Sequence, residues 1–229
     1  MYKYVLSFSK KGYIKYTSHL DMQRLFKRAF RRCGIDLAYS QGFNPHPKMG
    51  FAQPLSLGYE ARGELLEFET KEPVSKSKIM DELLANLPEG IGIVNFGSIL
   101  EKKKTVAAAV ISAEYEVTLP FSRVDDNIEK TVENYLRQAK ITAFKRQKKS
   151  KELKEVDIRD KIQKITLKYT EENGVKLMVL LDCGSRSNLS VELVIETFLE
   201  FGKLDVERHE IEVCRNKLIL PVDYGIKWM

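Results

Sequence analysis

The sequence has few of the residues that build metal and redox sites. Its 229 residues include only three cysteines and three histidines. Cys33, Cys183 and Cys214 lie far apart, form no CxxC pair and have no histidine at metal-ligand spacing. A disulfide framework, a structural zinc site and an iron–sulfur cluster therefore have little support. We expect buried or idle thiols, with no metal and no cofactor.

Long apolar runs are also missing. No stretch approaches the roughly 20 apolar residues that a membrane-spanning helix needs, so we expect no membrane association. Residues 1–4 open directly into strand-like alternation and do not resemble a signal peptide. The 43% of hydrophobic residues and 10% of aromatic residues can build ordinary cores, which argues against intrinsic disorder. A cytoplasmic protein is the default expectation.

Charge is present in abundance but is unevenly distributed. The chain has a formal net charge of +6. Residues 1–48 contain ten basic and two acidic residues, a net charge of +8, whereas the other 181 residues have a net charge of −2. A local basic field argues for an anionic partner better than a high overall isoelectric point does. Neither the composition nor the charge distribution indicates an oligomeric state.

The spacing of apolar residues predicts the same order of elements, βαββαβ, in both halves of the chain. In the first half, strands are expected at residues 2–9, 51–58, 64–70 and 91–100, with a further short strand at 35–39, and helices at 18–33 and 73–86. In the second half, strands are expected at 114–119, 158–169, 175–182 and 205–214, with a further strand at 141–146, and helices at 124–139 and 190–201. We therefore predict an α+β fold, a tandem pair of ferredoxin-like sandwiches, with domains at 1–104 and 105–229 joined near the charged residues 102–105.

The first predicted helix carries a cationic face. Four basic residues recur at i, i+3, i+4 and i+7, so their side chains share one face opposite the apolar one. They are Arg24, Lys27, Arg28 and Arg31. Like charges at this spacing repel one another, and a bound anion such as a nucleic-acid phosphate would relieve that repulsion. The alternative is an ordinary solvated helix face.

The N-terminus of the same helix has a second candidate site. Thr17 or Ser18 can cap the helix, and its free N–H groups with Ser18 and His19 could bind an anion. His19 could instead act as a general acid or base, supported by Asp21. The plainer interpretation is that a hydroxyl caps the helix, His19 fills a gap and Asp21 favours the positive helix end.

The loop at residues 39–48 combines aromatic side chains with turn-forming residues. Tyr39, Phe43 and His46 could stack on bases while Lys48 contacts a phosphate. The alternative is a structural loop whose Phe43 fills the core. His46 and His19 would need a third ligand to hold a metal, and no residue at standard spacing supplies one.

A third candidate lies in the second half, in front of the last predicted helix. Ser185, Arg186 and Ser187 follow a glycine and precede Ser190, a composition typical of an anion-binding loop. A plain turn with Ser190 as helix cap explains the segment equally well. The lysine-rich residues 144–151 are balanced by acidic residues downstream and are expected to form a solvated loop.

Two motifs resemble a known family. SHLD at residues 18–21 and YSQGFNPHP at residues 39–47, with GSRSNL at 184–189, resemble the radical-SAM-linked proteins of unknown function. That family occurs alone or fused behind a radical SAM domain, so the resemblance implies a radical SAM enzyme as partner but no particular reaction. The chain has no CxxxCxxC motif and is not itself a radical SAM enzyme.

These observations support one main hypothesis and two alternatives. The main hypothesis is a non-catalytic accessory protein that binds structured RNA, a transfer or ribosomal RNA, and presents it to the radical SAM partner. One alternative is a metal-independent RNase or transferase in which His19 is the acid or base, with His46 nearby. A fold-level similarity to CRISPR repeat-processing endonucleases is consistent with this alternative but assigns no residue a role. The other is a purely protein-facing subunit of the radical SAM enzyme.

Overall fold

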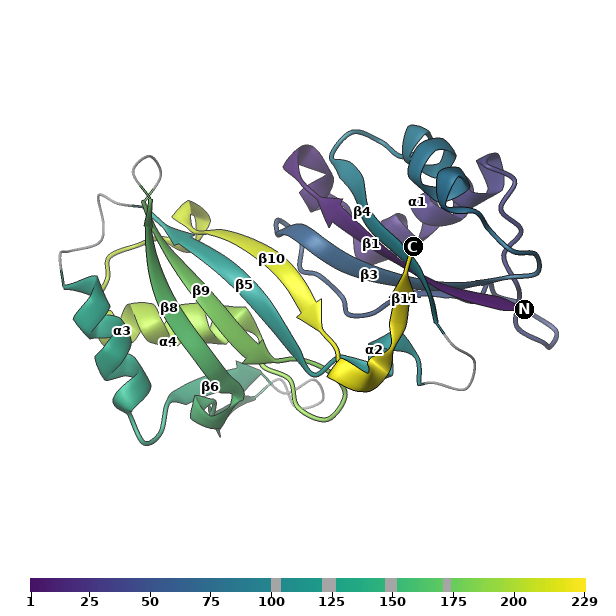
Figure 1. Ribbon diagram of the computed structural model, residues 1–229. Helices are drawn as coiled ribbons and strands as arrows, with labels where there is room; N and C mark the ends of the chain where they lie inside the picture. The colour runs from purple at the N-terminus through teal and green to yellow at the C-terminus, as the bar shows by residue number, and fades with distance from the viewer. Residues whose placement is uncertain (100–103, 121–126, 147–151, 171–173) are drawn as a thin grey trace. The chain divides into compact units, whose positions relative to one another are not determined.

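The computed structural model describes residues 1–99, 104–120, 127–146, 152–170 and 174–229. The chain forms two compact units (Figure 1). Unit 1 contains Met1–Ile111 and Arg215–Met229, and unit 2 contains Ser112–Cys214. The fold is α+β, as predicted. None of the helices in the described part of the chain is long and apolar enough to cross a membrane.

Unit 1 is built on an antiparallel sheet. Its strands follow the order β11-β4-β1-β3-β10, and β2 pairs with β3 beside this path. The bounds are β1 Tyr2–Lys10, β2 Met49–Phe51, β3 Glu60–Thr70, β4 Ile91–Ile99, β10 Glu212–Ile219 and β11 Ile226–Trp228. The helical segments are η1 Gly12–Tyr16, α1 His19–Arg32, η2 Lys78–Leu83, α2 Val106–Ala109 and η6 Val222–Tyr224. The predicted helix at 73–86 is present, but its central part, η2, has π-helical hydrogen bonding.

Local sequence explains both ends of α1. Ser18 is the N-cap, and its hydroxyl accepts a hydrogen bond from the Asp21 N–H at 3.2 Å. Gly34 adopts a left-handed φ of 62° after the C-terminus, a conformation that suits glycine. The apolar face buries Met22, Phe26, Ala29 and Phe30. The predicted helix is therefore confirmed.

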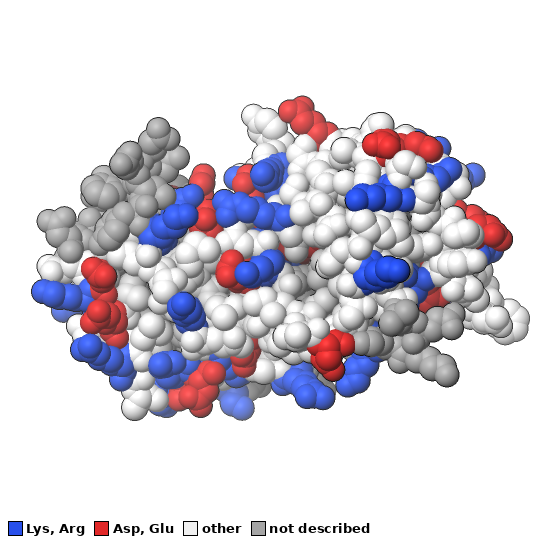
Figure 2. Space-filling model, viewed as in Figure 1, with Lys and Arg blue, Asp and Glu red and all other residues white. Residues whose placement is uncertain are grey.

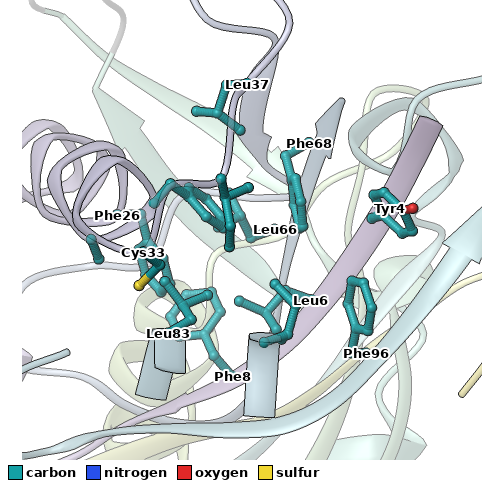
Figure 3. Packing of buried hydrophobic residues seen from close by; sticks show 14 of the residues in the cluster. Tyr4, Leu6, Phe8, Phe26, Cys33, Leu37, Leu66, Phe68, Leu83 and Phe96 are labelled. Atoms are coloured by element: carbon teal, nitrogen blue, oxygen red, sulfur yellow. The ribbon is translucent and has the colours of Figure 1, made fainter. Parts of the chain in front are cut away.

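Aromatic side chains dominate the core between α1 and the sheet of unit 1 (Figure 3). Alternate residues of β1, including Tyr4 and Phe8, point into this core because side chains alternate along a strand. Phe8 meets Phe26 edge-on at 5.0 Å between ring centroids, and Phe30 lies 4.7 Å from Phe68. Burying each such ring stabilises the fold by about 1.5–3 kcal/mol, which fixes α1 and its opposite, polar face in place.

Unit 2 has a sheet with the strand order β10-β5-β9-β8, to which β10 contributes its first residues. A separate two-stranded sheet is formed by β6 and β7. The strands are β5 Ser112–Leu119, β6 Thr142–Arg146, β7 Leu153–Asp157, β8 Ile162–Thr170 and β9 Gly174–Asp182. The helical segments are α3 Ile128–Arg137, η4 Arg159–Lys161, α4 Val191–Gly202 and η5 Arg208–Glu210.

Three predicted strands differ from the structure. The strand expected at 51–58 is present only at Phe51, the last residue of β2. Residues 35–39 make only isolated bridges, at Leu37 and Tyr39. The strand expected at 205–214 is instead β10, because Arg208–Glu210 form a 3-10 turn closed by a reciprocal Glu207–Glu210 capping box.

The C-terminal residues return to the first unit. Ile226–Trp228 pair with β4, so the end of the chain is docked as an edge strand. A single boundary at 104–105 does not describe this return, since unit 1 also includes residues 105–111 and 215–229. The expected linker residues 102–103, the start of the helix at 124–139 and the lysine-rich residues 147–151 lie outside the described residues.

Candidate nucleic-acid interface

A basic pocket lies beside the C-terminal half of α1. It has a volume of about 470 Å³ and is lined by Lys27, Arg28 and Arg31 on one side. Residues 34–37 and Tyr39 also line it. The structure thus brings together four of the residues predicted to bind nucleic acid, because the turn at Gly34 folds the following segment back along the helix.

Three cations concentrate positive charge on one side of the pocket. Lys27, Arg28 and Arg31 are exposed, and no hydrogen bond or ion pair engages their side chains within the described residues. Asp36 also lines the pocket, but its carboxylate lies 2.9 Å from the ammonium group of Lys71. The pocket therefore presents concentrated positive charge, which can bind phosphate or carboxylate groups.

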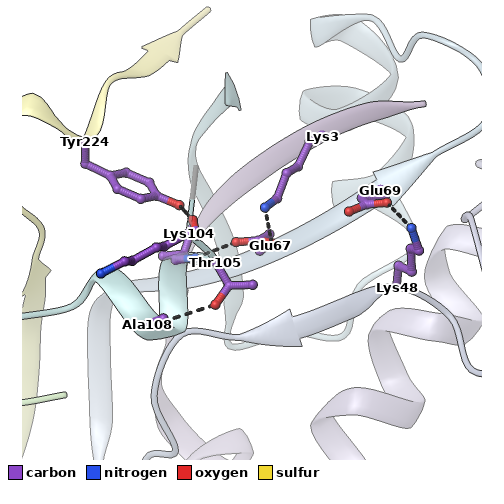
Figure 4. Close-up of polar contacts among 9 residues, drawn as sticks. Lys3, Lys48, Glu67, Glu69, Lys104, Thr105, Ala108 and Tyr224 are labelled. Atoms are coloured by element: carbon purple, nitrogen blue, oxygen red, sulfur yellow. Dashed lines mark hydrogen bonds and ion pairs between the residues drawn. The ribbon is translucent and has the colours of Figure 1, made fainter. Parts of the chain in front are cut away.

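Two other predicted cations have intramolecular partners. Arg24 donates from Nη1 to Asp21 Oδ1 at 3.0 Å. Lys48 donates from Nζ to Glu69 Oε2 at 2.8 Å (Figure 4). Each of these positive charges therefore has a carboxylate beside it. On the face of the molecule that Figure 2 draws, positive and negative side chains are similarly interspersed.

The loop at 39–48 is held at its base and exposed at its tip. Ser40 N–H donates to the His46 carbonyl at 2.8 Å, and the His46 N–H donates to Ser40 Oγ at 2.9 Å. Tyr39 also bridges to Pro47. The side chain of Phe43 is fully exposed, so the alternative in which it fills the core is wrong. The loop presents Phe43 and His46 to solvent.

At the N-terminus of α1, the polar side chains mainly bond to one another. Besides capping the helix, Ser18 donates from Oγ to Asp21 Oδ2 at 2.7 Å. This hydrogen bond, followed by that from Arg24, lowers the pKa of Asp21 below its usual 3.8. His19 is half-buried, packs edge-on against Phe51 at 5.4 Å and has its Nε2 3.2 Å from the Gln23 side chain.

The two histidines of the enzyme alternative have different surroundings. No hydrogen bond or ring contact joins His19 to His46 in the part of the chain that the structure describes. Among the described residues, no group of three or more His, Cys, Asp or Glu is arranged to hold a metal ion. The ring of His46 lies in the exposed loop with the aromatic residues described above.

In unit 2, a carboxylate of the chain itself, that of Asp182 at the end of β9, accepts hydrogen bonds beside the predicted anion-binding loop. Ser187 donates from Oγ to Asp182 Oδ2 at 2.7 Å, and Gln163 donates to the other carboxylate oxygen at 2.7 Å. Ser185 and Arg186 are exposed beside it. Ser190 occupies the N-cap of α4 without a side-chain hydrogen bond. A phosphate at this loop would meet the carboxylate of Asp182, which favours the first unit as the anion site.

The sequence interpretation missed a buried charge cluster in unit 1. Arg215, 2% exposed, forms a bidentate pair with Glu64 at 2.6 and 2.5 Å. Lys10 is also buried and donates to the Thr17 carbonyl at 3.1 Å. Burial lowers the pKa of Lys10, with Glu64 opposing this effect and Arg215 adding to it. Because Glu64 and Arg215 lie 151 positions apart, no local pattern could reveal the pair.

Comparisons with known proteins complete the description of this site. No curated protein matches the chain. One family model covers residues 3–191, which include α1, the basic pocket and the 39–48 loop. Its description is "Uncharacterized protein conserved in bacteria (DUF2344)". The chain belongs to this conserved bacterial family.

Proposed function

We propose that unit 1 binds structured RNA, a transfer or ribosomal RNA, through the basic pocket of α1. The observation that carries this proposal is the set of three exposed cations around one pocket, Lys27, Arg28 and Arg31, whose side chains make no hydrogen bond or ion pair with the described residues. Neighbouring cations on a helix destabilise it slightly, whereas phosphates between them would remove that repulsion. Guanidinium groups also match phosphate oxygens with two parallel hydrogen bonds.

The exposed loop at 39–48 supplies the preference for RNA over a plain polyanion. Phe43 at its tip and Tyr39 beside the pocket offer aromatic faces on which unpaired bases can stack. Proteins that recognise an RNA sequence mostly bind the loops, bulges and ends of the folded RNA, because the bases are accessible there. In this proposal the pocket positions the backbone and the loop selects unpaired bases.

We further propose an accessory role for the chain. The SHLD and YSQGFNPHP motifs, which resemble the radical-SAM-linked proteins, support a radical SAM enzyme as the partner that receives the RNA in the cytoplasm. The two motifs include the N-terminus of α1 and the exposed loop. Binding and presentation of RNA would then be the contribution of this chain, and the redox chemistry would belong to the partner.

We also propose that both units are variants of the ferredoxin-like sandwich. In unit 1 the antiparallel order β4-β1-β3-β2 supports this assignment, with α1 and η2 as the connecting helical segments. In unit 2 the order β10-β5-β9-β8 supports it, with α3 and α4 as connections and the β6–β7 hairpin as an insertion. Such sandwiches carry many functions, so the RNA proposal depends on the pocket and not on the fold.

A binding titration with a charge-reversal variant tests the function. Fluorescently labelled bulk transfer RNA is titrated with the wild-type protein and with Arg28→Glu/Arg31→Glu at low salt. We expect the double variant to lose at least about tenfold in affinity, because two phosphate contacts become repulsive. Arg24→Glu is the control, since Arg24 lies on the same helix but is paired with Asp21. Equal affinity of the wild type and the double variant would rule out this pocket as the site.

A further inference from the structure

Two tyrosines stand out from the surface just before α1. Tyr13 and Tyr16 are 95% and 64% exposed, and both belong to the 3-10 segment η1. A 3-10 helix has three residues per turn, so side chains at i and i+3 project in the same direction, about 6 Å apart along the axis. That separation is close to twice the 3.4 Å rise of a nucleic-acid strand, so one base could stack between the two rings.

The segment that carries these rings is firmly held. Ile14 packs against the core, and the Lys11 N–H donates to the Gly90 carbonyl at 2.8 Å. The Gly12 N–H donates to Glu60 Oε1 at 3.0 Å, and the Lys15 carbonyl accepts from Gly58 at 3.1 Å. The backbone is therefore ordered before any ligand arrives, which lowers the entropic cost of binding through exposed side chains.

The charges around the tyrosines favour an anionic ligand. Lys11 and Lys15 alternate with Tyr13 and Tyr16 along η1, and Lys15 Nζ lies 5.5 Å from the centroid of the Tyr16 ring. The carboxylate of Glu60 accepts from the backbone of the same segment, so it is already engaged. Aromatic faces interleaved with cations are typical of surfaces that bind single-stranded nucleic acid, where rings stack on bases and cations track the backbone.

We propose that η1 binds unpaired nucleotides of the RNA whose folded part occupies the basic pocket. This proposal rests on the proposed function and specifies its substrate class, an RNA with a single-stranded segment next to a structured region. The segment η1 is joined to α1 by Thr17 and Ser18, so the tyrosines and the pocket cations lie on consecutive helical segments of unit 1. From His19 to Lys27, α1 rises by about 12 Å. That rise corresponds to about three to four nucleotides of a stacked strand.

Substitution of both tyrosines tests the proposal. The full-length protein is titrated with labelled twelve-nucleotide oligouridylate and with inorganic polyphosphate, a polyanion without bases. Tyr13→Ala/Tyr16→Ala should bind oligouridylate at least about tenfold more weakly, because stacking is lost, while polyphosphate binding stays the same. Tyr13→Phe/Tyr16→Phe keeps the aromatic faces and should stay within about twofold of the wild type. Because both tyrosines are exposed, we expect the variants to fold like the wild type. Circular dichroism checks this.

The outcomes separate this proposal from the broader one. Unchanged oligouridylate binding by Tyr13→Ala/Tyr16→Ala overturns the role of η1, and the pocket proposal survives if Arg28→Glu/Arg31→Glu still loses transfer RNA. Absence of RNA binding by the wild type overturns both. A third arm uses vesicles of phosphatidylglycerol and phosphatidylcholine. If the tyrosines matter for vesicle binding and not for oligouridylate, η1 is a lipid-facing segment and the nucleotide proposal is wrong.

Discussion

Charged residues have opposite arrangements in two regions of unit 1. In the interior, Glu64 and Arg215 form a bidentate pair, and Arg215 donates further hydrogen bonds to the carbonyls of Gln53 and Pro54 at 3.1 and 3.0 Å. On α1, Lys27, Arg28 and Arg31 face solvent without such partners in the described part of the chain. The buried pair joins β3 and β10, two neighbouring strands that are far apart in the sequence. The exposed cations leave positive charge available to a ligand.

The buried charges of unit 1 contribute to folding, and we propose that its exposed cations contribute to binding. A buried ion pair is required for stability once it is formed, because removing one member leaves the other charge buried alone. Exposed cations of one sign repel one another, and the helix dipole offsets this repulsion only near the C-terminus of α1, at Arg31. We therefore predict that substitutions of the buried pair change the stability of unit 1, whereas substitutions of the exposed cations change RNA binding.

The largest effect is expected in the interior. Glu64→Ala leaves the Arg215 guanidinium without its carboxylate in a buried site, and should lower the free energy of unfolding by about 3–5 kcal/mol. Urea denaturation followed by circular dichroism measures this loss. Arg137→Ala is the control, because it breaks an exposed pair with Glu133 in α3 and should cost about 0–1 kcal/mol. Equal stability of the two variants would contradict the distinction drawn between the regions.

A smaller effect is expected at the N-terminus of α1. Ser18→Ala removes the cap of the helix and should lower the free energy of unfolding by about 1 kcal/mol. Part of this effect passes through Asp21, whose pKa is lowered mainly by the Ser18 hydroxyl. That part is present above the ordinary pKa of 3.8 and is lost as the pH falls through the lowered value. The difference between wild type and variant should therefore shrink in acid, and a constant difference would mean that Asp21 plays no part.

The site could be predicted from the sequence where local patterns decide. Ser18, the apolar spacing of α1 and Gly34 defined the helix, and helical geometry placed Lys27, Arg28 and Arg31 on one face. The ion-pair partner of Lys48 could not be predicted from a local pattern. Lys48 is neutralised by Glu69, a residue that reaches it only because β2 pairs with β3.

The fold was less predictable where distant segments meet. The strand β10 carries Glu212 and a buried Arg215, so its apolar alternation is broken and its position was predicted too early in the chain. The buried arginine is stable there only because Glu64 of β3 compensates it. The edge strand β11 has three residues, too few for a periodic signal.

The salt dependence of RNA binding tests whether the cations of the basic pocket contact RNA phosphates. Affinity for transfer RNA is measured as a function of salt concentration for the wild type and for Arg28→Gln/Arg31→Gln. We predict that the variant keeps the wild-type melting temperature. The negative slope of log affinity against log salt should become shallower by about 1.4–1.8, because two phosphate contacts are lost. The same slope in both proteins would contradict it, because the unpaired cations of α1 would then make no contact with RNA.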